Sequence, residues 1–258
     1  MLHRNTPEHS FVPSVDGVQL ATYELGDPEQ PTVFVVHGFA SSAIANWHAT
    51  GWTRDLTRAG FHVIGIDQRG HGASDKPHSP DAYTMELLVA DVEAVLDAYL
   101  LTEVRYVGYS LGARVGWQAA RDLGGRITQA VLGGIPDGDP LKSFQIADAR
   151  AHLEHGTELT DRLTGTYLTM AKALPGNDLA ALVALVEGMR GGPQPGAANA
   201  PIQPVLFATG SEDSILDASR VLADATPNGG FFEIPGRNHF NAPTSRAFRE
   251  AAIGFLKA

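Results

Sequence analysis

The clearest pattern along the chain is a series of short, almost unbroken apolar runs separated by segments of helical periodicity. Continuous apolar runs are typical of strands buried on both faces, as in a parallel sheet. Helical patterns at residues 52–59, 84–100 and 111–123 stand between several of these runs. This alternation predicts right-handed βαβ units and an α/β fold with a doubly wound, mostly parallel sheet. The apolar runs are residues 32–36, 62–66, 104–107, 130–132, 205–208 and 231–234.

Two segments depart from this alternation. Residues 18–25 alternate in polarity, which predicts an antiparallel edge strand. Residues 136–200 contain no strand-like run, and we expect them to form a helical cap inserted into a core made of residues 1–135 and 201–258. A helical insertion between two strands is a candidate lid over an active site; the alternative is an extra layer of surface helices. The expected cap helices lie near residues 142–154, 158–173 and 177–189, and a Gly/Pro/Ala-rich stretch follows at 191–201.

Composition narrows the function classes. The formal net charge is −10, so the chain lacks the basic surface that displaces counterions from nucleic acid, and we expect no nucleic-acid partner. There is no cysteine, which excludes a thiol nucleophile, a disulfide framework and a thiolate metal site. The polar N-terminal segment leads into no apolar signal region, and no stretch has the length of a transmembrane helix. We therefore expect a cytoplasmic protein, monomeric or homodimeric, without membrane association.

The most informative motif is Gly108-Tyr109-Ser110-Leu111-Gly112, which stands between a predicted strand and a predicted helix. A G-x-S-x-G at such a junction is the pattern of a nucleophile elbow, a turn sharp enough to lift the serine hydroxyl clear of the sheet. Glycine on either side lets neighbouring backbone approach a strained turn. Ser110 is therefore the candidate nucleophile.

A serine hydroxyl needs a base, usually a histidine oriented by a carboxylate, and in this arrangement the chain order is Ser, then Asp or Glu, then His. Asp213 and His239 follow Ser110 in that order, and each comes shortly after a predicted strand. The ends of parallel strands are where ligands bind in open α/β sheets. Asp213 is the preferred acid, with Glu212 and Asp217 as rivals.

Acyl transfer also requires two N–H donors for the oxyanion that forms in the transition state. Leu111 begins the predicted elbow helix, and its backbone N–H is one candidate. Phe39, in the His37-Gly38-Phe39-Ala40 loop after an early strand, supplies the other. We expect His37 to be structural, hydrogen-bonded to backbone in that loop.

With these residues placed, the chain resembles the α/β-hydrolase fold family over essentially its whole length. Residues 67–74 (DQRGHGAS) resemble a D-x-R-G-x-G-x-S loop that is mainly architectural in the family, so Asp67 and His71 are not expected to be catalytic. Residues 210–213 match the family's G-x-x-D segment and residues 236–239 its G-x-x-H-type loop. The elbow and the oxyanion loop are most similar to those of small bacterial capped serine carboxylesterases. Relatives that open epoxides or displace halide use Asp at the elbow, so Ser110 disfavours those reactions.

The resemblance implies a serine hydrolase that cleaves carboxylic esters, with a small-molecule ester as partner and no cofactor. Lactonase, C–C bond hydrolase and cofactor-free perhydrolase or haloperoxidase activities remain alternatives, as does a non-enzymatic ligand sensor. No metal site is expected. His152 and His155, three residues apart, lack an acidic partner at H-E-x-x-H spacing and are interpreted as exposed polar residues. Candidate residues for the substrate pocket are Trp47, Phe144, Tyr167 and Met170.

Overall fold

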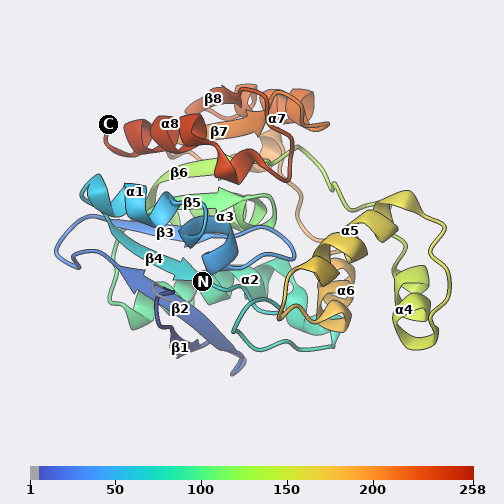
Figure 1. Ribbon diagram of the computed structural model, residues 1–258. Helices are drawn as coiled ribbons and strands as arrows, with labels where there is room; N and C mark the ends of the chain where they lie inside the picture. The colour runs from blue at the N-terminus through green and yellow to red at the C-terminus, as the bar shows by residue number, and fades with distance from the viewer. Residues whose placement is uncertain (1–5) are drawn as a thin grey trace.

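The computed structural model describes residues 6–258, so the first five residues of the polar N-terminal segment lie outside the described part. Its centre is an eight-stranded sheet in the order β1-β2-β4-β3-β5-β6-β7-β8 (Figure 1). The pairs β1–β2 and β2–β4 are antiparallel, and all other neighbouring strands are parallel. The predicted α/β fold with a mostly parallel sheet is confirmed. The strands are β1 (Ser10–Pro13), β2 (Gln19–Leu25), β3 (Thr32–Val36), β4 (His62–Ile66), β5 (Val104–Tyr109), β6 (Ile127–Gly133), β7 (Val205–Gly210) and β8 (Gly229–Ile234).

The prediction of an edge strand at residues 18–25 is wrong in one respect. The strand exists as β2 and is antiparallel, but β1 pairs with its outer side and forms the edge instead. β1 has four residues and ends at Pro13, which suits an edge because proline cannot donate to a further strand. A run this short carries too little alternation to be recognised from the sequence.

Helices cover both faces of the sheet, as a doubly wound fold requires. Alternate residues of β3 show the division. Phe34 and Val36 belong to the apolar cluster that includes residues of α2, α3 and α7, whereas Val33 and Val35 belong to the cluster that includes residues of α1 and α8. All five residues of β3 are buried, which explains its unbroken apolar run. These helices are α1 (Trp52–Arg58), α2 (Met85–Ala98), α3 (Leu111–Asp122), α7 (Leu216–Asp224) and α8 (Arg246–Leu256).

Three helices between β6 and β7 form a separate lobe beside the strand ends, coloured yellow-green to light orange in Figure 1. They are α4 (Ile146–His155), α5 (Arg162–Ala173) and α6 (Leu179–Gly188), so the three helices expected in residues 136–200 are confirmed. The lobe, called the cap below, has its own apolar cluster around Phe144. It is attached to the core through the 3₁₀ turn Pro80–Tyr83, which packs so closely on α6 that a Cβ at Gly188 would lie 2.1 Å from the Pro80 carbonyl oxygen.

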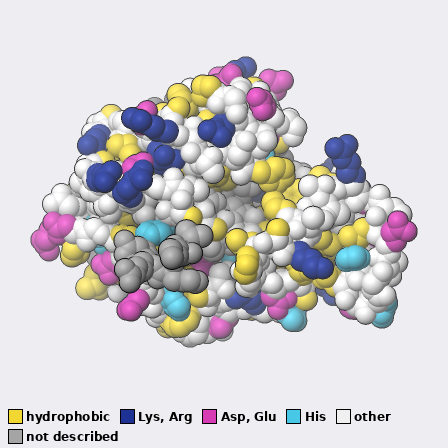
Figure 2. All heavy atoms as spheres, in the orientation of Figure 1, with side chains coloured by type: hydrophobic (Ala, Val, Ile, Leu, Met, Phe, Trp, Pro, Cys, Tyr) yellow, Lys and Arg dark blue, Asp and Glu magenta, His cyan; other side chains and the backbone are white. Residues whose placement is uncertain are grey.

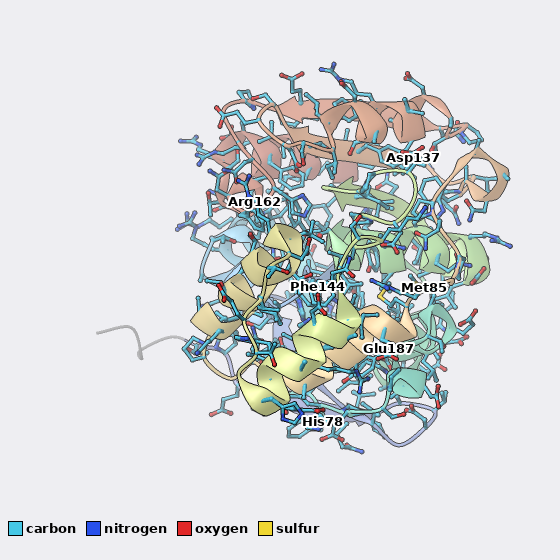
Figure 3. The ribbon with its side chains drawn as sticks, turned by 90° about the vertical axis from the view of Figure 1, so that its right-hand side faces the viewer. His78, Met85, Asp137, Phe144, Arg162 and Glu187 are labelled. Atoms are coloured by element: carbon cyan, nitrogen blue, oxygen red, sulfur yellow. The ribbon has the colours of Figure 1, made fainter. Side chains whose placement is uncertain are left out.

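A polar contact adds to this attachment. His78 Nε2 lies 2.8 Å from Asp178 Oδ2, and Figure 3 shows His78 at the lower end of the cap helices. Asp178 also caps α6 by accepting the Ala180 and Ala181 N–H groups. Among the helices of residues 6–258, none is both long and apolar enough to cross a membrane.

Candidate active site

Ser110 occupies a strained turn between β5 and α3. Its φ and ψ are 53° and −112°, a conformation that L-residues adopt at a cost of about 1–3 kcal/mol and that persists where the surroundings enforce it. The flanking glycines are required sterically, because a Cβ at Gly108 would lie 2.4 Å from the Gly112 carbonyl oxygen. The Ser110 N–H donates to the Gly133 carbonyl on β6 at 2.8 Å, which fixes the turn to the neighbouring strand.

The structure brings Ser110, Asp213 and His239 together from three different loops. His239 Nε2 lies 3.0 Å from Ser110 Oγ, and His239 Nδ1 lies 2.8 Å from Asp213 Oδ2. The Asp213 side chain is almost fully buried and also accepts the Ile215 N–H at 3.2 Å. Within residues 6–258, neither rival acid, Glu212 or Asp217, is hydrogen-bonded to His239.

The protonation pattern follows from these contacts. A carboxylate can only accept, so His239 donates its Nδ1–H to Asp213 and presents the Nε2 lone pair to the Ser110 hydroxyl. Tyr109 donates its hydroxyl to the His239 carbonyl at 2.6 Å, which holds the histidine loop against the elbow. The arrangement can deprotonate Ser110 as it attacks an electrophile.

The two expected oxyanion donors flank the same serine. Phe39 and Leu111 line a cavity with Ser110, and within residues 6–258 neither of their backbone N–H groups has a hydrogen-bond acceptor. Leu111 is the first residue of α3, so its N–H belongs to the free first turn of a helix. Both groups are therefore available to a negatively charged oxygen.

Two buried histidines hold the loop that carries Phe39. His71 Nε2 accepts the Ala40 N–H at 3.0 Å, and His37 Nε2 accepts the Gln68 N–H at 3.0 Å. Burial lowers the pKa of His37 to about 4 and that of His71 to about 3, so both rings are neutral at neutral pH and their Nε2 atoms can accept. The expectation that His37 is hydrogen-bonded to backbone in this loop is confirmed by its Nδ1–H, which donates to the Gly38 carbonyl at 2.8 Å.

Two cavities meet at Ser110, between core and cap. The first, of about 640 Å³, extends under α6 and is called the α6 cavity; the second, of about 880 Å³, extends along α5 and is called the α5 cavity. In Figure 2 apolar side chains are exposed along the junction between the core and the cap on its right. The α6 cavity is lined by Leu185, Val186 and Met189, and the α5 cavity by Met170, Ala173 and Leu174.

The structure separates the four predicted pocket residues into two pairs. Tyr167 lines both cavities and Met170 lines the α5 cavity; their contact with substrate stays a prediction. The assignment of Trp47 is wrong because its indole is fully buried against Trp52 in the core. The assignment of Phe144 is wrong because its ring is buried in the cap's own apolar cluster (Figure 3).

Sequence reasoning missed residues that the structure places at the site. Phe240 directly follows His239, is more than half exposed and lines both cavities; an exposed aromatic residue beside the candidate base was a usable signal. Arg114 lies one helical turn after Ser110 on α3 and is 7% exposed.

His152 is hydrogen-bonded to the Thr157 carbonyl, and within the described residues no group of His, Asp or Glu side chains is arranged to hold a metal ion.

Comparison with known proteins identifies the fold. Residues 31–156 match the family model described as alpha/beta hydrolase fold. A hydrolase from Pseudomonas aeruginosa PA01 is 24% identical, covers 98% of this chain and 100% of its own, and superposes with a TM-score of 0.79. The chain has the α/β-hydrolase fold. The resemblance inferred from the elbow and its partners is thereby confirmed at the level of the fold family.

Other similar α/β-hydrolase-fold proteins differ in their reactions. The enol-lactonase from Burkholderia xenovorans LB400 is 21% identical over 96% of this chain and 100% of its own, with a TM-score of 0.79. Epoxide hydrolase A from Mycobacterium tuberculosis is 38% identical over 104 residues, which are 40% of this chain. The match spans only 31% of that relative's length. These similarities therefore show the fold and not the reaction.

Proposed function

We propose that this α/β-hydrolase-fold protein is a serine hydrolase that cleaves carboxylic esters through an acyl-enzyme intermediate. The proposal rests on the two hydrogen bonds of His239, 3.0 Å to Ser110 Oγ and 2.8 Å to Asp213 Oδ2. They supply a nucleophile, its base and the group that orients the base, which together make up an acyl-transfer triad.

The reaction proceeds in two halves. Ser110 Oγ attacks the ester carbonyl carbon while His239 Nε2 takes the hydroxyl proton, and the carbonyl oxygen becomes an oxyanion held by the Phe39 and Leu111 N–H groups. Collapse of this intermediate breaks the C–O bond, and His239 returns the proton to the departing alcohol. Water then enters, gives a proton to His239, and releases the acid from Ser110 by the same steps.

The cavities favour an uncharged, largely apolar ester. Most of the α6 cavity wall is apolar, and its buried cation, Arg114, is already engaged by Asp139 and Gln194. Since Arg114 already has these partners, it offers little to a negatively charged substrate. A charged substrate group buried in this cavity would then lack a partner, which is costly. The apolar side chains of α6 can instead bury hydrocarbon at about 25 cal/mol per Å².

Epoxide hydrolysis is the alternative raised by relatives that carry that name. The elbow residue argues against it. Attack of Ser110 Oγ on an epoxide carbon would give a serine ether, which has no carbonyl carbon for water to attack, so the enzyme would be alkylated once and stop. An ester or a lactone leaves an acyl group on Ser110 that water can remove. Lactone cleavage, the reaction named for the Burkholderia neighbour, uses the same steps and is a closer alternative.

The test is turnover by wild type and Ser110→Ala on a 4-nitrophenyl ester, a matched alkyl ester, a lactone and an aryl epoxide. We expect sustained ester turnover by wild type and a loss of at least about 10³-fold in Ser110→Ala, with an unchanged circular dichroism spectrum. Near wild-type ester turnover by Ser110→Ala would overturn the assignment. Multiple turnovers of epoxide to diol would favour epoxide hydrolysis, and a burst without turnover on every substrate would favour a ligand sensor.

A further inference from the structure

The two cavities share a wall on the cap side of Ser110. Eight residues line both cavities, and four of these belong to the cap. If the acyl and alcohol parts of a bound substrate occupy different cavities, its ester group must therefore lie beneath these four cap residues. They are Asp161, Arg162, Thr166 and Tyr167, at the start of α5.

Two of the four have side chains whose polar groups are already used. Asp161 caps α5, and its carboxylate accepts both the N–H and the hydroxyl of Thr164 at 2.7 and 2.6 Å. Thr166 donates its hydroxyl to the Arg162 carbonyl at 2.8 Å. Both groups therefore stabilise the helix itself.

The other two have polar groups without a partner in the protein. Within residues 6–258, neither the Arg162 guanidinium nor the Tyr167 hydroxyl makes a hydrogen bond through its side chain. Arg162 is exposed at the outer start of α5 (Figure 3), so solvent hydrates it. Tyr167 is partly buried between the cavities. When a substrate expels water from them, the Tyr167 hydroxyl loses its hydrogen bond unless the substrate provides an acceptor.

Aromatic contacts fix the position of the Tyr167 ring. It packs edge-on against Phe39, which carries one oxyanion donor, with ring centroids 5.8 Å apart. On its other side it packs against Phe240, with centroids 6.4 Å apart, and Phe240 in turn packs against His239. The ring therefore spans the site from the oxyanion loop to the base. Burial, with a further contribution from the Asp213 carboxylate, raises the pKa of Tyr167, so the phenol keeps its proton and can donate.

We propose that the Tyr167 hydroxyl donates a hydrogen bond to the alkoxy oxygen of the bound ester. This inference rests on the ester hydrolysis proposed above. In the proposed reaction the carbonyl oxygen points to the Phe39 and Leu111 N–H groups of the core. The alkoxy oxygen is then the other polar atom of the ester, and it lies beneath the cap where the two cavities meet. As the C–O bond breaks, its electron pair moves to this oxygen, the proton comes from His239 Nε2, and Tyr167 keeps its own proton. The hydrogen bond stabilises the charge that develops on the alkoxy oxygen before proton transfer is complete.

This contact selects for a class of substrate. Charge builds up most on the leaving oxygen of an alkyl ester, because an alkoxide is a far poorer leaving group than a phenoxide. A sulfur atom accepts hydrogen bonds weakly, so a thioester gains little from the same donor. The structure therefore points to alkyl esters as the substrates that benefit from the cap.

The test compares Tyr167→Phe with wild type on three substrates that share one acyl group: an alkyl ester, a 4-nitrophenyl ester and an alkyl thioester. Tyr167→Phe keeps the ring contacts and removes only the hydroxyl. We expect kcat/KM to fall about tenfold for the alkyl ester, the loss of one hydrogen bond, and by less than about twofold for the other two. Tyr99→Phe is the matched control, because it removes a hydroxyl that contacts Thr22 far from both cavities, and should change none of the three rates.

Equal losses on all three substrates would mean that Tyr167 acts through the shape of the site, and no loss on any of them would mean that its hydroxyl is not used; either result overturns the proposal. Ser110→Ala measured on the same substrates separates this from the proposed function. If Ser110→Ala is inactive while Tyr167→Phe shows no preference among leaving groups, ester hydrolysis stands and the role of the Tyr167 hydroxyl does not.

Discussion

Gly112 lies directly against Val36: a Cβ at Gly112 would be 2.1 Å from the Val36 carbonyl oxygen. The obstacle is backbone, which cannot rotate away as a side chain can, and a Cβ would also lie 2.6 Å from the His37 carbonyl oxygen. This close approach packs the start of α3 against the backbone of residues 36 and 37, directly before the loop that carries Phe39.

Gly112→Ala should therefore destabilise the protein by about 3 kcal/mol or more, at the upper end of overpacking effects. Any folded fraction should have a displaced oxyanion loop and reduced kcat. Denaturant unfolding monitored by tryptophan fluorescence measures the first effect. Gly254→Ala is the control, since a Cβ there meets nothing within 4 Å in α8, and it should be neutral or stabilising by up to about 1 kcal/mol. Equal stability of the two variants would contradict the steric argument.

The choice of acid can be tested with a pair of adjacent substitutions. Asp213→Asn replaces the carboxylate that lies 2.8 Å from His239 Nδ1 with an amide, which favours the wrong tautomer of the ring, and kcat should fall by about 10⁴-fold. Glu212→Gln removes a neighbouring charge that makes no contact with His239 and should stay within about twofold of wild type. A larger loss for Glu212→Gln than for Asp213→Asn, measured by steady-state ester hydrolysis, would show that the acid is misassigned.

The sequence predicts the sheet, the elbow and the order of the three loops because each depends on local chemistry. Buried parallel strands require unbroken apolar runs, and Ser110 needs glycine at 108 and 112 whatever the substrate. The pocket depends on side-chain direction, which the sequence does not carry. Trp47 stands eight residues after Phe39 yet points into the core, whereas Phe240 is exposed beside His239. The edge position of β1 was missed for a related reason, since four residues show no clear period.

The two buried histidines that hold the Phe39 loop, His37 and His71, predict that the stability of the protein depends on pH. Their folded-state pKa values, about 4 for His37 and about 3 for His71, lie below the unfolded value near 6.5. The unfolded chain therefore binds more protons below pH 6.5, and stability, complete above that pH, is lost as the pH falls toward 4. Each histidine should contribute a slope on the order of 1 kcal/mol per pH unit in this window.

Denaturant unfolding at pH 7.0 and 5.5 measures the slope before most carboxylates titrate. His71→Gln should show a smaller slope, because it removes one of the two groups while keeping an acceptor for the Ala40 N–H. His155→Gln, at a site that is 73% exposed, should leave the slope at the wild-type value. If both variants keep that slope, the buried histidines are not its source.

Arg114 joins the nucleophile helix to both segments that connect the cap to the core. Its Nη1 lies 3.3 Å from Asp139 Oδ1 in the segment leaving β6, and its Nη2 hydrogen-bonds Gln194 in the segment returning to β7. Gly138 donates its N–H to the Pro195 carbonyl at 3.3 Å and ties the two segments directly. Because Arg114 is one turn after Ser110 on α3, these contacts set the position of the cap above the nucleophile.

Arg114→Met should therefore loosen the cap while the core stays folded. Loss of the charged hydrogen bonds costs about 1.5–3 kcal/mol, and this loss is local because Asp139 is partly exposed and can be hydrated. We expect faster tryptic cleavage after Lys142 and Arg190, which flank the cap helices, and a several-fold lower kcat/KM for esters. Arg121→Met, on the same helix but 49% exposed, should match wild type in both assays. The masses of the fragments after brief trypsin treatment distinguish a loosened cap from general destabilisation. Cleavage spread over both core and cap would indicate general destabilisation and contradict the prediction.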